Sequence, residues 1–154
     1  MGTVMDIYET TRDGYLLTTD PARLDRDAVF RYISGESYWS KDMTRSFFER
    51  TLAGSLCFSL IAPAGEQCGF ARVATDYAAL AWLSDVYVLA AHRGRGLGKF
   101  IIAAAMAHPR LKGMRRWMLA TSDAHELYAK FGFSSVAPNS LMTRVDRESY
   151  KRDD

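Results

Sequence analysis

Cysteine and proline are scarce in this chain of 154 residues, and neither positive nor negative charge predominates. The two cysteines, Cys57 and Cys68, are too few for a disulfide framework, and their spacing fits no zinc-binding pattern. We therefore expect buried free thiols in a reducing compartment. With only four prolines, the chain shows no proline-rich linker, internal repeat or low-complexity segment. A formal net charge of +2 argues against the broad basic face of a duplex-binding protein.

Long hydrophobic runs are also missing. The N-terminal stretch MGTVMDIYETTRDGY lacks the apolar core of a secretion signal, and no apolar run approaches the length of a membrane span. We therefore predict a cytoplasmic protein that binds neither nucleic acid nor membrane. The length is typical of one domain, which we expect to occupy residues 1–154.

The sequence does contain an alternation of strand-like and helix-like segments. Asp13-Gly14 predicts a hairpin, Asp20-Pro21 predicts a helix start, and Ser40 or Asp42 is expected to cap a second helix that ends at Gly54. Further strands are predicted at 56–61, 69–75, 81–89, 116–121 and 141–145, and further helices at 96–108 and 124–131.

This order predicts an α/β (α+β) fold with a mixed, mostly antiparallel sheet. The strand at 116–121 follows a strand–helix crossover, so it should lie parallel to the strand at 81–89. The polar tail RESYKRDD is expected to fray.

The most informative stretch is AAHRGRGLGKF at 90–100, between a predicted strand and a predicted helix. Its glycines allow successive backbone N–H groups to approach one phosphate group, and the helix N-terminus adds unpaired amides and a positive dipole end. Arg93, Arg95 and Lys99 add positive charge at the rim. The stretch therefore predicts a phosphate-binding loop.

Three kinds of phosphate loop compete for this stretch. A P-loop requires glycine five residues before Gly98 and Ser or Thr after its lysine, whereas this chain has Arg93 and Phe100. A dinucleotide fingerprint, G-x-G-x-x-G, would end here on Lys99 or Ile101 instead of glycine. The pattern Arg/Gln-x-x-Gly-x-Gly/Ala is met at every fixed position from Arg93 to Gly98.

That third pattern resembles the acyl-CoA-dependent N-acetyltransferases of the GNAT superfamily. The stretch LSDVYV at 83–88 resembles the fourth strand of that family, and AHELYAKFGF at 124–133 resembles its A-x-x-L-Y-x-K-x-G-F segment. The resemblance implies a GNAT-like fold in which two parallel strands splay apart and the pantetheine arm of acetyl-CoA enters the gap, with no metal. It implies cofactor contacts at Tyr87, Val88, Leu89, Arg93, Gly94, Arg95, Gly96, Leu97, Gly98, Lys99 and Asp123.

The resemblance also implies roles in the reaction. The backbone N–H of Val88 would polarise the acyl carbonyl, and Tyr128 would donate a proton to the departing thiolate. Asp123 stands where many relatives carry an asparagine that contacts the pantetheine arm. Since an ionised aspartate only accepts hydrogen bonds, that contact would differ here.

Transfer to an amine also requires a proton acceptor, because an amine of pKa ~10.4 is uncharged in only about four molecules per ten thousand at pH 7. Asp85 is the first candidate, and the alternative is a carboxylate paired with an arginine such as Arg72. His125 is the second, since it lies one helical turn from Tyr128, and the alternative is a surface histidine.

The acceptor pocket is expected to combine the loop between the first two helices with the neighbouring strands. Its candidate residues are Tyr38, Trp39, Arg72, Asp76 and Trp82, together with Tyr87. Aromatic faces and acidic groups can hold a cation. We predict acetyl transfer from acetyl-CoA to a primary amine of a small molecule or peptide in a ternary complex, with a homodimer left open. A non-catalytic acyl-CoA sensor and a nucleotide-binding protein of another fold are the alternatives.

Overall fold

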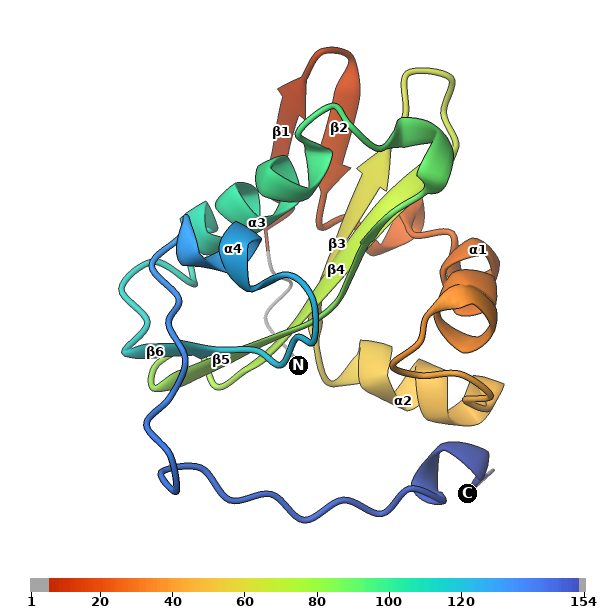
Figure 1. Ribbon diagram of the computed structural model, residues 1–154. Helices are drawn as coiled ribbons and strands as arrows, with labels where there is room; N and C mark the ends of the chain where they lie inside the picture. The colour runs from red at the N-terminus through yellow and green to blue at the C-terminus, as the bar shows by residue number, and fades with distance from the viewer. Residues whose placement is uncertain (1–5, 153–154) are drawn as a thin grey trace.

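The computed structural model describes residues 6–152 as a central sheet with helices on both faces (Figure 1). The strands are β1 (Glu9–Arg12), β2 (Tyr15–Thr18), β3 (Leu56–Ile61), β4 (Gln67–Thr75), β5 (Leu80–Val88) and β6 (Arg116–Met118). The helices are α1 (Arg26–Arg31), α2 (Arg45–Ala53), α3 (Leu97–Ala107) and α4 (His125–Ala129), with short turns η1 (Pro21–Arg23), η2 (Tyr32–Glu36), η3 (Ala90–His92) and η4 (Ser149–Lys151). The expectations that concern residues 1–5 at the N-terminus and residues 153–154 of the polar tail lie outside the described residues.

The six strands form one sheet in chain order, from β1 to β6. Neighbouring strands are antiparallel from β1 to β5, whereas β6 runs parallel to β5. The parallel pair follows from the crossover through α3, because a chain that leaves one end of a strand and returns through a helix re-enters the sheet in the same direction. The predicted mixed, mostly antiparallel sheet is confirmed, and so is the hairpin at Asp13-Gly14.

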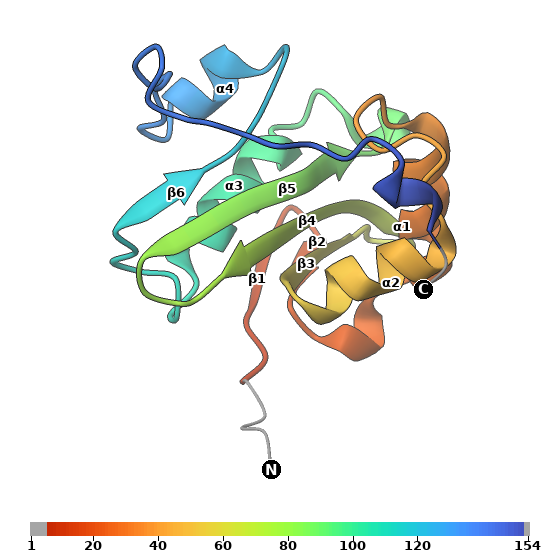
Figure 2. The same ribbon diagram turned by 90° about the horizontal axis from the view of Figure 1, so that it is seen from below.

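Apolar side chains pack on both faces of the sheet. On one face, Ile101 of α3 belongs to a buried cluster that includes Phe58 and Ala71. On the other face, α1 and α2 lie over the strands, and Phe48 belongs to a second cluster that includes Phe70 (Figure 2). Phe70 and Ala71 are neighbours in β4, so they point to opposite faces as strand alternation requires.

β5 and β6 pair at one end only. Residues 80–82 lie opposite residues 116–118, and the register continues no further. Beyond this point β5 continues beside β4 to Val88, while the chain after β6 turns toward α4. The two strands therefore diverge and leave a gap along the second half of β5.

A bulge interrupts β5 where it borders this gap. Phe70 pairs with Tyr87 but Arg72 pairs with Ser84, so two residues of β5 face one residue of β4. Asp85 lies in the bulge with a φ of 57°, in the left-handed region that non-glycine residues seldom adopt. Because a bulge redirects side chains, it decides where the carboxylate of Asp85 lies.

The first two helices begin later than predicted. Asp20 caps only the short turn η1. The helix α1 begins after a second cap, Asp25, whose carboxylate accepts a hydrogen bond from the N–H of Ala28 at 3.0 Å. Thr44, rather than Ser40 or Asp42, caps α2. The predictions missed these starts because several acceptor side chains stand close together, and any of them can accept an N-terminal amide.

The C-terminal part departs furthest from the prediction. The structure has no strand at 141–145, and residues 134–148 are exposed. The tail, which was expected to fray, docks on α2: the rings of Phe47 and Tyr150 lie 5.0 Å apart, and the N–H of Thr44 donates to the Tyr150 carbonyl at 2.8 Å. The exposed segment is therefore fixed at its far end.

Candidate functional site

The glycine loop between η3 and α3 lines a small cavity of about 280 Å³ that is open to solvent. Gly96 is the N-cap of α3 and has a φ of 75°, which glycine adopts without strain. Gly98 follows in the first turn, and a Cβ added there would meet no protein atom within 4 Å. Space is therefore open to a ligand beside the unpaired amides at the start of α3.

Positive side chains lie in the wall of this cavity and next to it. Arg12 of β1 donates from Nη1 to the Gly96 carbonyl at 3.3 Å. Lys130, just after α4, contacts Lys99, and this contact together with the repulsion between the two ammonium groups lowers the pKa of Lys99. An anion placed beside the pair would relieve this repulsion, so the loop suits a ligand with more than one negative charge.

Arg93 is exposed, yet its guanidinium is hydrogen-bonded to the protein. Its Nε donates to the Val88 carbonyl at 2.9 Å, and its Nη2 donates to the Tyr32 hydroxyl at 3.3 Å. These bonds tie the loop to the end of β5. Arg93 also lines both the loop cavity and a larger cleft.

The end of β5 directs one backbone amide into the gap between β5 and β6. Val88 lies opposite Gly69, and the N–H of the next residue, Leu89, donates to the Cys68 carbonyl at 2.8 Å. Because successive residues of a strand point their amides to opposite edges, Val88 directs its N–H away from β4. The N–H of Leu89 is therefore already hydrogen-bonded within the sheet, whereas the N–H of Val88 can donate to a group in the gap.

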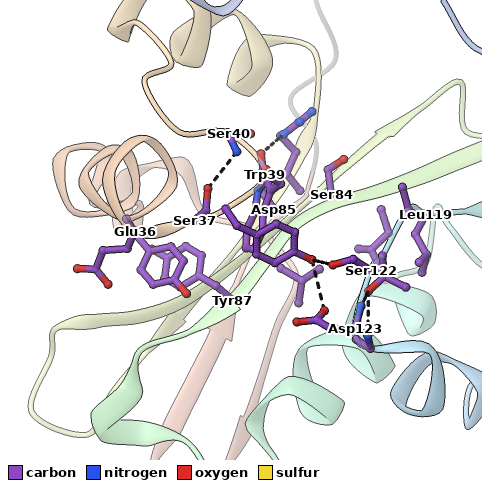
Figure 3. A pocket seen from close by; sticks show the side chains of 18 of the residues that line it. Glu36, Ser37, Trp39, Ser40, Ser84, Asp85, Tyr87, Leu119, Ser122 and Asp123 are labelled. Atoms are coloured by element: carbon purple, nitrogen blue, oxygen red, sulfur yellow. Dashed lines mark hydrogen bonds and ion pairs between the residues drawn. The ribbon is translucent and has the colours of Figure 1, made fainter. Parts of the chain in front are cut away.

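A cleft of about 980 Å³ occupies this gap. Figure 3 shows Trp39, Asp85 and Tyr87 on one side and Ser122 and Asp123 on the other. The cleft is therefore bounded by β5, by the loop before α2 and by the chain that leads from β6 to α4. These segments come from three separate parts of the sequence.

Tyr128 of α4 is half-buried in the wall of this cleft. Burial raises its pKa, and the nearby Tyr38 and Asp123 raise it further. Tyr38 is itself held in place, since its hydroxyl accepts a hydrogen bond from Ser122 at 2.9 Å and donates to the Asp123 carboxylate at 3.3 Å. The phenol of Tyr128 therefore keeps its proton at neutral pH and can act as a proton donor.

Asp85 is buried with both carboxylate oxygens engaged, and its side chain is only 5% exposed. Oδ2 accepts from Nε of Arg72 at 2.8 Å, and Oδ1 accepts from Nε1 of Trp39 at 2.9 Å. The ion pair with Arg72, which the sequence left as the alternative, is present. Each oxygen keeps a further lone pair, so the ion pair does not prevent Asp85 from accepting a proton through water.

Stacked aromatic rings line the cleft beside β5. The rings of Tyr32 and Tyr87 lie 3.8 Å apart and almost parallel, and burial raises the pKa of Tyr87. Trp39 and Tyr38 meet edge to face at 5.1 Å. The carboxylate residue Glu36 lines the same cleft. This combination suits a flat or cationic organic group.

The structure brings most of the predicted acceptor residues together, and Tyr38, Trp39, Arg72 and Trp82 all line the cleft. Asp76 does not. Its carboxylate instead accepts three backbone N–H groups of the turn at 78–80, at 2.8–3.1 Å, and these hydrogen bonds lower its pKa. Asp76 therefore stabilises the turn between β4 and β5.

His125 and Arg95 are exposed, and neither is among the residues that line the cleft or the loop cavity. His125 opens α4 at the surface, and the i, i+3 relation to Tyr128 does not bring it into the cleft. A one-turn spacing fixes relative angle on a helix, but only packing decides which position faces inward.

Sequence reasoning missed Arg12, Lys130, Tyr32 and Tyr150. Arg12 reaches the loop from 84 positions earlier in the chain, and no local pattern signals such a contact. Lys130 belongs to the AHELYAKFGF segment, where it was not given a role. Tyr32 and Tyr150 line the cleft, and the only signal for Tyr150 was a single aromatic residue in a polar tail.

Within residues 6–152, no helix has the length and apolar character needed to traverse a membrane, and no group of three His, Cys, Asp or Glu side chains is placed to hold a metal ion. Cys57 and Cys68 are free, and burial raises the pKa of each thiol to about 11. Such thiols stay protonated at neutral pH, so they are poor nucleophiles.

Comparisons with known proteins point to one family. Residues 54–135, which include the glycine loop and Tyr128, match the family model described as the acetyltransferase (GNAT) domain. A Gibberella zeae protein named "Putative acetyltransferase FG08082" is 31% identical over 141 residues, which cover 78% of each chain.

Solved structures of other proteins also resemble this chain. A GNAT-family protein of Xanthomonas campestris is 45% identical, with 90% of this chain and 97% of that chain covered and a TM-score of 0.84. A glucosamine-6-phosphate N-acetyltransferase of Arabidopsis thaliana shares the fold at 17% identity, with 91% of this chain and 97% of that chain covered and a TM-score of 0.59. The chain belongs to the GNAT family of acetyltransferases.

Proposed function

We propose that the chain transfers the acetyl group of acetyl-CoA to a primary amine by direct attack in a ternary complex. The observation that carries this proposal is that the loop cavity and the cleft share Val88 and Arg93 in their walls. A ligand with its phosphates at the loop can therefore extend past Val88 into the cleft that Tyr128 lines. Acetyl-CoA has this form, with an anionic head and a long neutral arm that ends in the thioester.

On the donor side, we assign the phosphates to the loop. The amides at the start of α3 and the open space at Gly98 receive the pyrophosphate, because a helix N-terminus favours negative charge. Arg12, Lys99 and Lys130 supply positive charge around it.

The cleft supplies the groups that the transfer requires. The N–H of Val88 donates to the acetyl carbonyl oxygen, which gains negative charge as the amine nitrogen attacks the carbonyl carbon. The C–S bond then breaks, and Tyr128 gives its phenolic proton to the departing thiolate. The raised pKa of Tyr128 keeps that proton available until the thiolate forms.

On the acceptor side, the amine must give up a proton. We assign this proton to Asp85, acting through a water molecule, because Asp85 is the carboxylate of β5 that lines the cleft. The aromatic rings of Tyr32, Tyr87 and Trp39, together with Glu36, suit an acceptor whose amine is carried on a cationic or flat organic body.

Release of free CoA thiol, measured over a panel of primary amines, tests this proposal. We expect acetyl-CoA-dependent thiol release with at least one amine, and a product heavier by one acetyl group. The Tyr128→Phe variant serves as the matched control and should release thiol far more slowly. Tight acetyl-CoA binding without release on any amine would favour a sensor instead, and calorimetric binding of ATP or NAD but not acetyl-CoA would overturn the donor assignment.

A further inference from the structure

Three polar side chains from separate elements meet beside the glycine loop. Nδ1 of His92, the last residue of η3, lies 2.8 Å from the hydroxyl of Tyr15 in β2. Nε2 of the same ring lies 3.4 Å from a carboxylate oxygen of Glu66, in the turn between β3 and β4. Both ring nitrogens of His92 therefore face a polar group. None of the three residues takes part in the acetyl transfer proposed for the cleft.

This cluster of Tyr15, His92 and Glu66 is partly shielded from water. Tyr15 is 6% exposed and the His92 side chain is 17% exposed, whereas half of the Glu66 side chain is exposed. The rings of Tyr15 and His92 also pack edge to face, with their centroids 5.7 Å apart. A shielded hydrogen bond is electrostatically stronger than one in open water, so the ring of His92 is held in one orientation.

The elements that carry the cluster pack against one another and against the loop. A Cβ added to Gly14, at the tip of the β1–β2 hairpin, would lie 3.2 Å from Pro63 in the β3–β4 turn. The same hairpin directs Arg12 to the Gly96 carbonyl at 3.3 Å. Figure 1 shows both tips at the end of the sheet where the glycine loop lies. The hairpin therefore holds the loop at two points, through Arg12 and through Tyr15.

His92 also lies in the wall of the loop cavity. Histidine is the side chain that changes charge between about pH 5 and 8. In the neutral ring, the hydroxyl of Tyr15 donates to Nδ1 and the N–H at Nε2 points to Glu66. In the charged ring, the oxygens of Tyr15 and Glu66 both accept. The ring can therefore gain a positive charge beside the cavity without moving.

We propose that His92, held by Tyr15 and Glu66, is a positioning residue of the donor loop whose positive charge strengthens the binding of the acetyl-CoA pyrophosphate. The proposal rests on the assignment of the phosphates to this loop. It adds a pH dependence to donor binding that the loop amides alone would not produce, because amides carry no titrating charge.

Other charged groups lie close to the same loop. Arg93 follows His92 in the chain, and Lys99, whose contact with Lys130 lowers its pKa, lines the cavity. Arg12 forms an ion pair with Asp13 at 3.7 Å. A substitution of His92 leaves all of these groups in place, so the difference between the two proteins measures the contribution of His92.

The pH dependence of donor binding gives the first test. Dephospho-acetyl-CoA is the probe, because it keeps the pyrophosphate but lacks the 3′-phosphate, a monoester that itself titrates near pH 6. Calorimetry should show about threefold or more tighter binding at about pH 5.5 than at about pH 8, since an added positive charge favours an anion. His92→Gln keeps a hydrogen-bonding side chain without the charge and should lose this gain. Equal gains in the two proteins would overturn the proposal.

The partners of His92 give a second test. Glu66→Gln keeps an oxygen that can accept from Nε2 but removes the negative charge that favours the charged ring, so the gain in affinity should need a lower pH. Tyr15→Phe keeps the ring packing and removes the hydroxyl, so it should weaken binding at both pH values. Tyr8→Phe is the matched control, since it removes a hydroxyl at the open end of the same hairpin, where Tyr8 pairs with Thr19. Donor binding that Glu66→Gln and Tyr15→Phe leave unchanged would contradict the proposal.

NMR titration of the histidine rings tests the unaltered protein. The absent signal in His92→Gln identifies His92, and His108, at the far end of α3, is the internal control. Saturation with dephospho-acetyl-CoA should move the titration of His92 to higher pH, because a ligand that the charged ring binds more tightly also holds the proton more tightly. The titration of His108 should stay in place. An unmoved titration of His92 would refute its role alone, whereas a protein that binds no acetyl-CoA would refute the donor assignment and this inference with it.

Discussion

Gly98 offers a substitution that separates ligand binding from folding. A Cβ at this position would meet no protein atom within 4 Å, so Gly98→Val adds its side chain only to the space that we propose for the pyrophosphate. Gly96, two residues earlier, is the contrast. Its φ is 75°, and a Cβ there would lie 3.2 Å from the Arg12 guanidinium.

The two positions should respond in opposite ways. Valine is a better helix former than glycine by a few tenths of a kcal/mol, so Gly98→Val should leave the free energy of unfolding unchanged or slightly higher. A hydrogen bond to a charged group contributes about 1.5–3 kcal/mol, so losing one phosphate contact should lower the acetyl-CoA affinity about 10- to 150-fold. Gly96→Ala should instead cost about 1–2 kcal/mol of stability, because it forces an L residue into the left-handed region.

Calorimetric titration with acetyl-CoA and thermal unfolding followed by circular dichroism measure both quantities. For a chain of this size, the cost at Gly96 corresponds to a fall in Tm of about 2–8 °C, whereas the Tm of Gly98→Val should not fall. If Gly98→Val bound acetyl-CoA as tightly as the unaltered protein, the phosphate would not lie against the start of α3, and the loop assignment would fail.

Three further substitutions test the cleft and the core. Tyr128→Phe should lower kcat by about 100-fold or more while the dissociation constant for acetyl-CoA changes little, because only proton donation to the thiolate is lost; an unchanged kcat would remove Tyr128 from the mechanism. Asp85→Asn should cost about 3 kcal/mol in urea unfolding, since it leaves the mostly buried Arg72 without its counter-charge, and its rate should recover as the pH approaches the pKa of the amine. A rate that stays flat with pH would mean that Asp85 has a structural role only. Burial and the nearby charge of Arg110 lower the pKa of His108. The contribution of neutral His108 to stability is therefore full above about pH 6.5 and is lost as the pH falls toward the folded pKa. The urea midpoint should drop between pH 7 and 5, and His108→Gln should make that drop smaller. Parallel pH curves for the two proteins would disprove the role of His108.

The parts that the sequence predicted well carry short-range signals. The Asp13-Gly14 hairpin, the strand at β3 and the helix that begins after the glycine loop each depend on neighbouring residues, through turn chemistry, side-chain period and capping. The loop itself is local too, because its amides and glycines lie within a few residues of one another. Tyr128, which the structure places in the wall of the cleft, was also predicted from the segment around it.

The failed predictions depended on contacts between distant parts of the chain. The strand expected at 141–145 has β-forming residues, but a strand exists only where another strand pairs with it. Helical spacing made His125 a candidate base, with a surface histidine as the alternative, and its exposed position agrees with the alternative. Arg12 and Lys130 became part of the loop only because β1 and α4 fold against it.

Asp85 shows where the division lies. The sequence by itself placed a carboxylate on the strand before the glycine loop, and it showed that this loop resembles the acyl-CoA loop of the GNAT family. Only the tertiary structure decided what surrounds that carboxylate: a bulge redirects it, and Arg72 and Trp39, 13 and 46 positions away in the chain, occupy its two oxygens. A phosphate-binding loop is built from the backbone of neighbouring residues. The proton affinity of a buried acid depends instead on the charges and hydrogen-bond donors that folding brings close to it.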